Sequence, residues 1–336
     1  MAKLVSILVP AYNAEKWIAD TIASATQQTW PHKEVIVLDD GSADGTFKIA
    51  QTLASPSVKV VRQENAGACR TRNNLLAMAQ GDYIQWLDAD DLLDSEKIAR
   101  QLEGADDGRT SLTLLTAEWG RFFFRYERAK FIPDALWQDL GPTDWILARF
   151  NENVWMNPVV WLVSRRLTEA AGPWDERLSA SGDDDGEYIC RVAGASDGVR
   201  FVAGARCYYR IGTIGSLNWN MERSEKSLDS LVLSLTLAVR HLRSLENSER
   251  TRKAAVRHLQ TFLPYFYAAD RHYFHELDAV AREFGGALHP PRASWKYSPI
   301  ETVFGARSAR NVMANWRAVK LLAQRDVDRL LHRIGL

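Results

Sequence analysis

A pair of carboxylates, Asp88 and Asp90, flanks Ala89 directly after the apolar run Tyr83–Leu87. Two carboxylates one residue apart on a tight turn can offer oxygen ligands to a single hard divalent cation. Such a cation would bridge a diphosphate and neutralise charge on it as it leaves. The pair therefore predicts a site for Mn²⁺ or Mg²⁺, with an acidic turn that caps the following helix as the alternative.

A second acidic cluster, Asp39-Asp40-Gly41-Ser42, closes the apolar run Glu34–Leu38. A carboxylate at this point can accept hydrogen bonds from a base N–H and from ribose hydroxyls, while Gly41 permits a positive φ. Tyr12 and Asn13 follow the first apolar run, which Pro10 ends, and can stack on or bond the same base. A solvent-exposed turn at 39–42 and ordinary packing of Tyr12 are the alternatives.

The segment Asn65-Ala66-Gly67 precedes a helix that carries Arg70 and Arg72 near its start. Backbone N–H groups, the helix dipole and the guanidinium groups can converge there on a phosphate. A capped helix with solvated arginines is the alternative. The sequence contains no GxGxxG and no GxxxxGK[ST], which argues against a dinucleotide fingerprint or a P-loop.

Asp183, Asp184 and Asp185 crowd three carboxylates together before a predicted helix at Glu187–Val192. Repulsion among them raises the pKa of at least one, which makes it usable as a general base. An acidic N-terminus on a surface helix is the alternative. No Ser-His-Asp order and no HExxH supports a hydrolase.

The elements that carry these clusters alternate between strand and helix. The apolar runs at 5–10, 34–38, 58–62 and 83–87 predict strands, and helical patterns separate them. Strands that are apolar on both faces predict a parallel sheet covered by helices, an α/β fold with its polar clusters at the carboxyl ends of the strands. Such sheets bind ligands at that edge. Asn13, Asp44 and Ser95 are the predicted helix caps, and a further strand is predicted at 159–163.

Beyond residue 215 the sequence becomes helical. An apolar stripe is formed by Leu228, Leu231, Leu235, Ala238 and Leu242. The sequence therefore predicts a main domain over 1–215, a helical module over 216–288, and a linker with a basic amphipathic helix over 289–336. Residues 292–336 carry nine Lys or Arg and three Asp or Glu, a net charge of +6. The sequence leaves two alternatives for this helix: it contacts an anionic membrane surface, or it docks on the rest of its own protein.

The whole chain of 336 residues carries 42 basic and 42 acidic side chains, so no global field attracts nucleic acid, which is excluded as a partner. The three cysteines are far apart and fit neither a disulfide framework nor a zinc site. The apolar stretches are too short to span a membrane. These features predict a cytoplasmic protein, either free or peripheral at the inner face of the membrane; they do not indicate an oligomeric state.

Six segments in order resemble glycosyltransferase family 2, whose domain has the GT-A fold: SILVPAYN, VIVLDDGSADGT, QENAGACRTRNN, GDYIQWLDADD, AGPWDERL and DDDGEYICR. The similarity covers about residues 4–215. It implies that Tyr12, Asp39 and Asp40 hold the nucleoside, and that Asp88 and Asp90 serve the metal and the donor diphosphate, with Asp90 as the direct ligand. The acid-pair motif matches with Asp185 as the base, and a shift of one residue would nominate Asp184.

The resemblance implies an inverting enzyme that moves a sugar from a nucleotide diphosphate donor to a hydroxyl of a saccharide, lipid-linked or other acceptor, in cell-surface polysaccharide or glycoconjugate synthesis. UDP is the expected nucleotide, with dTDP open. A nucleotidyltransferase that makes nucleotide sugars and a non-catalytic binding subunit are the alternatives. The expected nucleotide-sugar-binding residues are Pro10, Tyr12, Asn13, Asp39, Asp40, Asn65, Gly67, Arg72, Asp88, Ala89 and Asp90.

The sequence departs from the family pattern at Gly212. Many members have a histidine shortly after a Tyr-Arg pair, whereas here Tyr209-Arg210 is followed by Ile211, Gly212 and Thr213. If that histidine supports the metal or the diphosphate, another group must substitute for it in this chain.

Overall fold

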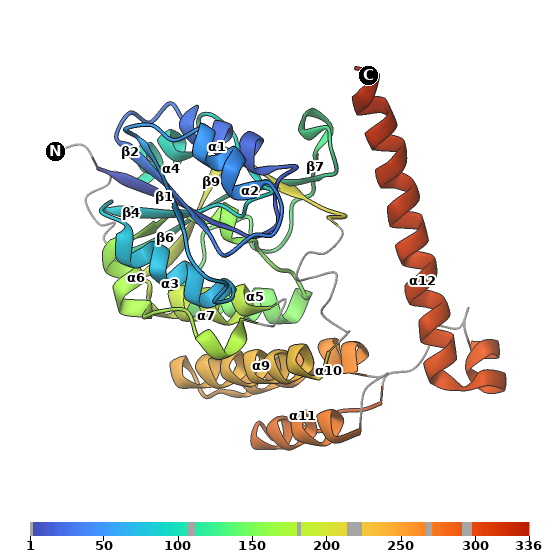
Figure 1. The fold of residues 1–336 in the computed structure, drawn as a ribbon. Coiled ribbons are helices and arrows are strands. Elements are labelled where there is room, and N and C mark those ends of the chain that lie inside the picture. The colour runs from blue at the N-terminus through green and yellow to red at the C-terminus, as the bar shows by residue number, and fades with distance from the viewer. Residues whose placement is uncertain are drawn as a thin grey trace.

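The first four apolar runs form a parallel sheet in the computed structural model, which describes residues 3–105, 112–179, 183–213, 224–266, 271–290 and 298–335 (Figure 1). The sheet has the order β3-β2-β1-β4-β8, and β8 is antiparallel to β4. Its strands are β1 (Val5–Ala11), β2 (Lys33–Asp39), β3 (Val58–Arg62), β4 (Tyr83–Trp86) and β8 (Val163–Ser164). The central strands are buried on both faces, as the continuous apolar runs predicted.

Helices connect the parallel strands and cover both faces of this sheet (Figure 1). They are α1 (Ile18–Thr26), α2 (Thr46–Thr52), α3 (Ala68–Met78), α4 (Lys97–Ala105) and α6 (Arg165–Ala171). Asp44 accepts the N–H of Thr46, the first residue of α2, at 3.0 Å, although Gly45 occupies the cap position. The other two predicted caps are wrong: Asp94, not Ser95, accepts the N–H of Glu96 before α4, and Asn13 lies four residues before Trp17, the residue that precedes α1.

A second sheet continues the first. Its order is β5-β9-β6-β7, with strands β5 (Leu92–Leu93), β6 (Thr113–Phe122), β7 (Lys130–Phe131) and β9 (Gly198–Arg210). β6 and β9 run parallel, with an irregularity in register between Ala117 and Glu118. The two sheets meet where Leu115 and Leu162 exchange backbone hydrogen bonds of 3.2 and 2.9 Å. Because β9 also pairs with β5, the end of β9 lies close to the loop that follows β4.

The predicted strand at 159–163 is wrong for most of its length. Residues Pro158–Val160 form the 3-10 turn η3, and only Val163–Ser164 pairs as a strand. Pro158 begins this turn, and a proline has no N–H to donate to a ladder. Two more 3-10 turns are η2 (Tyr126–Arg128) and η4 (Glu176–Leu178), and the remaining helices of this part are α5 (Pro142–Glu152) and α7 (Asp184–Ala195).

A helical layer lies beneath the sheets in Figure 1 and consists of α9 (Glu225–Leu245), α10 (Glu249–Phe266) and α11 (Arg271–Glu283). The predicted apolar stripe of α9 is buried and belongs to the same core as the sheets. α9 packs on α7, and α10 packs on α5. The predicted boundary at 215/216 and most of the predicted linker lie outside the described residues, so the division of the chain at these points stays a prediction.

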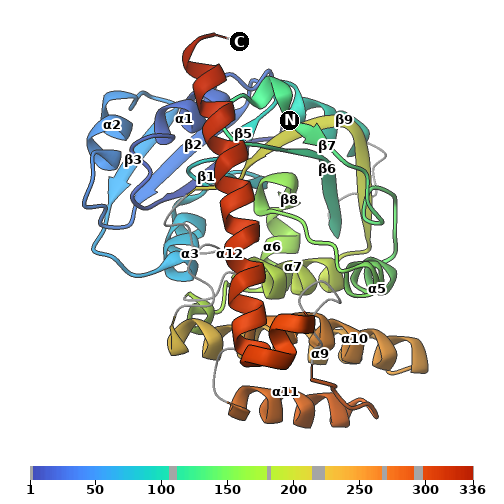
Figure 2. The same cartoon turned by 90° about the vertical axis from the view of Figure 1, so that its right-hand side faces the viewer.

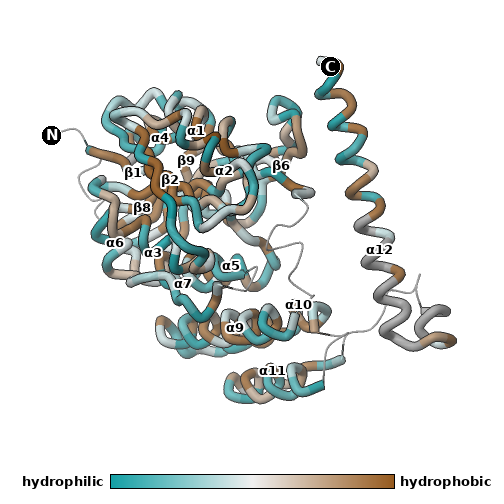
Figure 3. Tube along the Cα trace, in the orientation of Figure 1, coloured by the Kyte–Doolittle hydropathy of each residue, from teal (hydrophilic) through white to brown (hydrophobic). Residues whose placement is uncertain are grey.

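The last helix, α12 (Ser298–Arg333), runs along one side of the molecule (Figures 1 and 2). It lies within the range 289–336 that was predicted to hold the linker and the basic helix. Hydrophobic and hydrophilic residues alternate along its C-terminal part, whereas the middle of β2, Val35–Leu38, is continuously hydrophobic (Figure 3). Within the described ranges, no helix combines the length and the hydropathy needed to cross a bilayer.

Candidate active site

The loops after β1 and β2 are bonded to each other at the carboxyl edge of the sheet. Asn13 has a φ of 50°, and this left-handed turn aims its side chain at the second loop. Its N–H donates to Ser42 Oγ at 2.9 Å, and its Oδ1 accepts the N–H of Ala43 at 2.9 Å. The exposed Tyr12 stands beside this junction, where a base could stack on its ring.

Asp40 joins the loop after β2 to the start of α3. Its carboxylate accepts the N–H groups of Ala66 and Gly67 at 2.8 and 3.0 Å, and Asn65 Nδ2 donates to the Asp40 carbonyl at 3.0 Å. Gly41, with a φ of +72°, allows this approach, because a Cβ there would lie 2.8 Å from the Asn65 nitrogen. The predicted residues Asp40, Asn65 and Gly67 are therefore brought together.

Asp39 is fully buried, and one of its carboxylate oxygens is unpaired within the described ranges. Its Oδ2 accepts the Ser42 N–H at 3.2 Å and lies 3.3 Å from Arg62 Nε. Its Oδ1 is buried without a hydrogen-bond partner in the described structure. An unpaired buried oxygen is costly, so a ligand N–H or hydroxyl donated to it would be favourable.

Arg72 connects the loop after β4 to the start of α7. Its Nη1 lies 2.5 Å from Asp184 Oδ2, and its Nη2 lies 3.2 Å from Asp88 Oδ1. The guanidinium carbon also packs over the Trp174 ring, 4.5 Å from its centroid. One buried arginine therefore places the two acidic clusters predicted from the sequence at the same rim. This arrangement also means that two protein carboxylates already occupy Arg72, which was predicted to bind phosphate.

Asp90 lies beside the end of β9. Its Oδ2 accepts the Thr213 hydroxyl at 2.9 Å, and Arg210 Nε donates to its carbonyl at 2.8 Å. Burial, together with repulsion from Asp88, raises the pKa of Asp90 to about 6. The neighbouring Asp91 is buried as well, and burial followed by repulsion from Asp90 and Asp88 raises its pKa further above the usual range.

The sequence reading missed Asp91, Arg210 and Thr213 as members of this site. Asp91 Oδ1 accepts the Arg210 N–H at 2.8 Å, across 119 residues of chain. The sequence signal for Asp91 was its position directly after the predicted metal-binding pair, in the run Asp88-Ala89-Asp90-Asp91. For Arg210, the last residue of β9, and for Thr213, which follows it, the sequence offered only their place in the chain, since their partners are remote.

The oxygens of Asp88 and Asp90 suit a hard divalent cation. Asp88 Oδ2 and Asp90 Oδ1 bond to no other residue within the described ranges, and the like charges repel each other. The same ranges hold no group of three or more His, Cys, Asp or Glu placed around one point. Of the described residues, Asp88 and Asp90 would therefore be the ligands, and phosphate oxygens and water would complete the coordination of the ion.

The three carboxylates at the start of α7 differ in their environments. Asp183 lies 3.3 Å from Arg149 and accepts the Ser234 hydroxyl, and Asp184 is bound by Arg72. Asp185 is half-buried, and its carboxylate forms no hydrogen bond with another described residue. Burial, and then repulsion from Asp184 and Asp183, raises its pKa well above the usual range. Of the three, Asp185 has the carboxylate that is left for a substrate.

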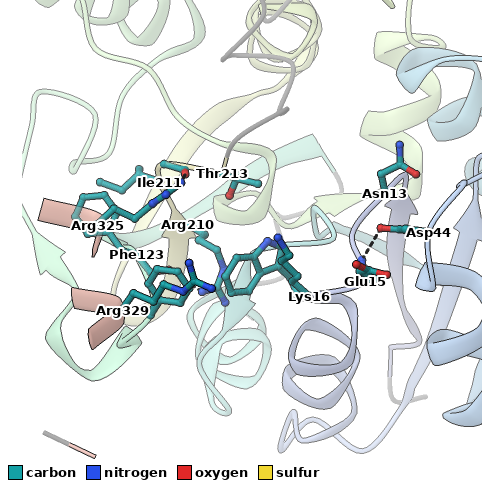
Figure 4. A pocket seen from close by; sticks show the side chains of 13 residues that line it. Asn13, Glu15, Lys16, Asp44, Phe123, Arg210, Ile211, Thr213, Arg325 and Arg329 are labelled. Atoms are coloured by element: carbon teal, nitrogen blue, oxygen red, sulfur yellow. Dashed lines mark hydrogen bonds between the residues drawn. The ribbon is translucent and has the colours of Figure 1, made fainter. Parts of the chain in front are cut away.

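A cleft of about 300 Å³ lies beside Thr213, whose hydroxyl donates to Asp90, on the side of α12 (Figure 4). Thr213 and Arg210 line it between the loops after β1 and β2 on one side and α12 on the other. Its lining residues are Asn13, Glu15, Lys16, Trp17, Asp44, Phe123, Phe124, Arg210, Ile211, Gly212, Thr213, Arg325 and Arg329. Asn13 is the predicted site residue among them.

Residues 6–160 match the sequence model of Glycosyl transferase family 2. This part of the chain belongs to glycosyltransferase family 2. The match confirms the resemblance of the first four of the six segments; the last two, AGPWDERL and DDDGEYICR, lie beyond residue 160.

Structures of other glycosyltransferases confirm that the family 2 domain has the GT-A fold. Staphylococcus aureus TarS 1–349, in complex with UDP-GlcNAc, matches with a TM-score of 0.64 and 16% identity, over 93% of this chain and 92% of that one. The mannosyltransferase PcManGT from Pyrobaculum calidifontis, in complex with GDP-Man and Mn²⁺, matches with a TM-score of 0.52 and 17% identity, over 95% and 88% of the two chains.

A curated relative matches over less than a third of this chain. The Escherichia coli enzyme WfgD, a UDP-Glc:α-D-GlcNAc-diphosphoundecaprenol β-1,3-glucosyltransferase, is 40% identical over 101 residues. The alignment covers 30% of this chain and 40% of WfgD, so this chain spans less than half of that relative.

Proposed function

We propose that the protein is a metal-dependent, inverting glycosyltransferase that moves a sugar from a nucleotide diphosphate donor to an acceptor hydroxyl. The observation that carries the proposal is the bridge formed by Arg72. It holds Asp88, beside the metal ligand Asp90, and Asp184, beside the base Asp185, at one rim of the sheet. Donor activation and removal of the acceptor proton require groups that are close to one another in this way.

The nucleoside would lie across the loops after β1 and β2, with Tyr12 on the base and Asp39 accepting a hydrogen bond through its unpaired oxygen. UDP is the proposed nucleotide, because WfgD uses UDP-Glc and the structural relative TarS binds UDP-GlcNAc. Asp88 and Asp90 would hold Mn²⁺ or Mg²⁺ on the diphosphate. When bound, the ion supplies a Lewis acid that neutralises the charge developing on the leaving diphosphate.

Asp185 would accept the proton of the acceptor hydroxyl as the oxygen attacks the anomeric carbon. Its raised pKa makes it a stronger base than an ordinary aspartate. Attack from the face opposite the donor diphosphate forms the new C–O bond, breaks the C–O bond to the phosphate, and inverts the anomeric carbon. A saccharide or lipid-linked acceptor in polysaccharide or glycoconjugate synthesis is proposed, because WfgD acts on a diphosphoundecaprenol-linked sugar.

We also propose that α12 contacts an anionic membrane surface, at the inner face of the cytoplasmic membrane. The large apolar residues of this helix described as exposed are Val303, Phe304, Val312, Trp316, Val319, Val327 and Leu330, and the exposed Ile334 follows its end. Basic residues outnumber acidic ones in this part of the chain. An apolar surface surrounded by positive charge favours the interface of anionic lipid.

A thermal-shift screen of nucleotide sugars, with and without Mn²⁺, tests the proposal and identifies the donor. A ligand that binds only the folded state raises the melting temperature. We expect UDP-sugars to stabilise the protein in the presence of Mn²⁺ and uridine alone to stabilise it much less. Equal shifts by all nucleotides, or shifts that do not depend on the ion, would contradict the proposal.

Asp88→Asn and Asp197→Asn form a matched pair for this screen. Asp197 is exposed in the turn between α7 and β9. We expect Asp88→Asn to lose the shift that requires Mn²⁺ and Asp197→Asn to retain it. Loss in both variants would mean that the ion acts elsewhere.

A further inference from the structure

Two arginines of α12 line the cleft next to Asp90 from the side opposite the family 2 loops. Arg325 and Arg329 are one helical turn apart and therefore lie on the same face of the helix. Figure 4 shows both side chains extending toward Arg210 and Thr213. These side chains come from beyond residue 160, where the match to the family ends.

A charge pair fixes this part of α12 against the GT-A domain. Asp328 accepts the N–H groups of Phe124 and Arg125 at 2.9 and 3.2 Å and the Nε of Arg125 at 2.7 Å. The side chains of Arg125 and Asp328 are 18% and 14% exposed, so the contact is largely shielded from water. His332 adds a stacked ring contact on Phe124. The positions of Arg325 and Arg329 are therefore set by docking.

Arg325 covers the backbone at Gly212, where the chain presents no side chain to the cleft. Its Nη1 lies 3.3 Å from the Gly212 carbonyl. Gly212 has a φ of +77°, and a Cβ there would lie 3.2 Å from the Phe123 ring and 3.3 Å from Arg325 Cδ. The next residue, Thr213, bonds to Asp90. The guanidinium group of Arg325 thus contacts Gly212, and the neighbouring Thr213 bonds to the proposed metal ligand Asp90.

The cleft is lined by more basic side chains than carboxylates that could pair with them. Lys16 and Arg329 form no ion pair within the described ranges, and the acidic partner of Arg325 is its exposed neighbour Asp326. Backbone N–H groups already occupy the two acidic residues of the lining, since Glu15 accepts from Gly45 and Asp44 accepts from Thr46. The cleft therefore suits an anion.

We infer that α12 completes the donor site, with Arg325 and Arg329 binding the terminal phosphate of the donor diphosphate. This inference rests on the proposed function, because it requires the diphosphate to be bound at Asp90. A guanidinium group can donate two parallel hydrogen bonds to phosphate oxygens, which a water molecule cannot reproduce. The C-terminal helix would then act as a specificity element that distinguishes a diphosphate from a monophosphate.

Calorimetric titration of the full chain with UDP and with UMP, both with Mn²⁺, tests this inference. Arg325→Gln should lower the affinity for UDP about tenfold while the affinity for UMP stays the same, because only UDP carries the second phosphate. Lys320→Gln is the matched control, since Lys320 lies on the same helix, is exposed and is outside the cleft lining. It should leave both affinities unchanged.

Asp328→Asn provides a second variant that alters no residue of the cleft. Loss of the charge pair with Arg125 should release α12 and lower the preference for UDP over UMP, with both arginines intact. Circular dichroism checks that the GT-A domain remains folded in each variant.

The outcomes separate this inference from the proposed function. If the wild-type protein prefers UDP to UMP and Arg325→Gln keeps that preference, the inference is overturned and the proposed function stands. If the wild-type protein shows no preference for UDP, both fall. An equal loss of UDP and UMP affinity in Arg325→Gln would also overturn the inference, because it would indicate a change of structure.

Discussion

At the scale of single residues, the site depends on how its carboxylates are partnered. Asp88 and Asp184 each share Arg72, whereas Asp185 has no bonded partner among the described residues. A buried carboxylate without a cation has a raised pKa and is a better proton acceptor than a paired one. The geometry therefore favours Asp185 over Asp184 as the base, a choice that the sequence left open.

Replacement of Asp185 by Asn should reduce sugar transfer by about three orders of magnitude or more, because the proton acceptor is lost. Binding of the UDP-sugar should remain within about twofold, since Asp185 is not expected to contact the donor phosphates. The release of UDP with acceptor present and the affinity for the donor measure these two effects.

Asp184→Asn serves as the comparison for this variant. It removes the charge that pairs with Arg72 and should lower the melting temperature, because a buried arginine loses a partner. Turnover near the wild-type value in Asp185→Asn, with turnover abolished in Asp184→Asn, would reverse the assignment of the base.

The sequence predicted the acidic residues of the site better than their partners. Local patterns reveal the strands and helices at whose ends Asp39, Asp88 and Asp185 lie. Arg210 and Thr213 reach Asp90 across more than 100 residues, so no local pattern links them to it. The pairing of β6 with β9 and of β9 with β5 places them there, and that pairing is a property of the tertiary structure.

At the scale of elements, the parallel strands could be predicted because both of their faces are buried. Continuous apolar runs then mark each strand directly. The segment at 159–163 is equally apolar and buried, but it forms a 3-10 turn and a two-residue strand. Burial alone therefore does not distinguish a strand from a turn that packs in the core, and Pro158 was the local signal that argued against a strand.

The packing of the helical layer predicts a dependence of stability on pH. His258 of α10 is buried against Phe150 of α5, with ring centroids 3.8 Å apart, and neither of its nitrogens has a partner in the described structure. Burial, followed by the positive charge of Arg149, lowers its pKa well below the usual value. The folded protein therefore keeps His258 neutral at a pH where the unfolded chain binds a proton.

Stability should thus be complete above about pH 6.5, the unfolded value, and should fall as the pH drops below it. The loss at pH 5.5 should be on the order of 1 kcal/mol from this residue. Urea unfolding at pH 7.5 and 5.5 measures it, with His258→Phe as the control for other titrating groups. The inference would be wrong if the variant lost as much stability as the wild-type protein.

At the scale of the whole molecule, α12 carries two different surfaces. Near its end, Asp328 and Arg325 face the GT-A domain, and elsewhere large apolar side chains such as Phe304 and Trp316 are about 70% and 66% exposed. The sequence left docking and membrane contact open as alternatives. The structure shows docking for the last turns, and the exposed apolar residues leave the membrane proposal in place for the rest.

The full chain should bind vesicles that contain anionic lipid and should not bind zwitterionic vesicles. Trp316→Ser should weaken this binding, and high salt should release the protein, because charge attraction is screened. Ile132→Ser is the control, since Ile132 is equally exposed but lies outside α12. Co-sedimentation measures binding; equal binding of both kinds of vesicle, or no effect of Trp316→Ser, would argue against the contact.

The central claim is that the acidic rim binds a nucleoside diphosphate through a divalent ion held at Asp90. Calorimetric titration of UDP in the presence of Mn²⁺, with the wild-type protein, Asp90→Asn and Asp185→Asn, tests it most directly. We predict that the wild-type protein and Asp185→Asn bind UDP with similar affinity, and that Asp90→Asn loses at least about tenfold because a ligand of the ion is removed. Equal affinity in Asp90→Asn, or binding of UDP that does not require Mn²⁺, would contradict the account.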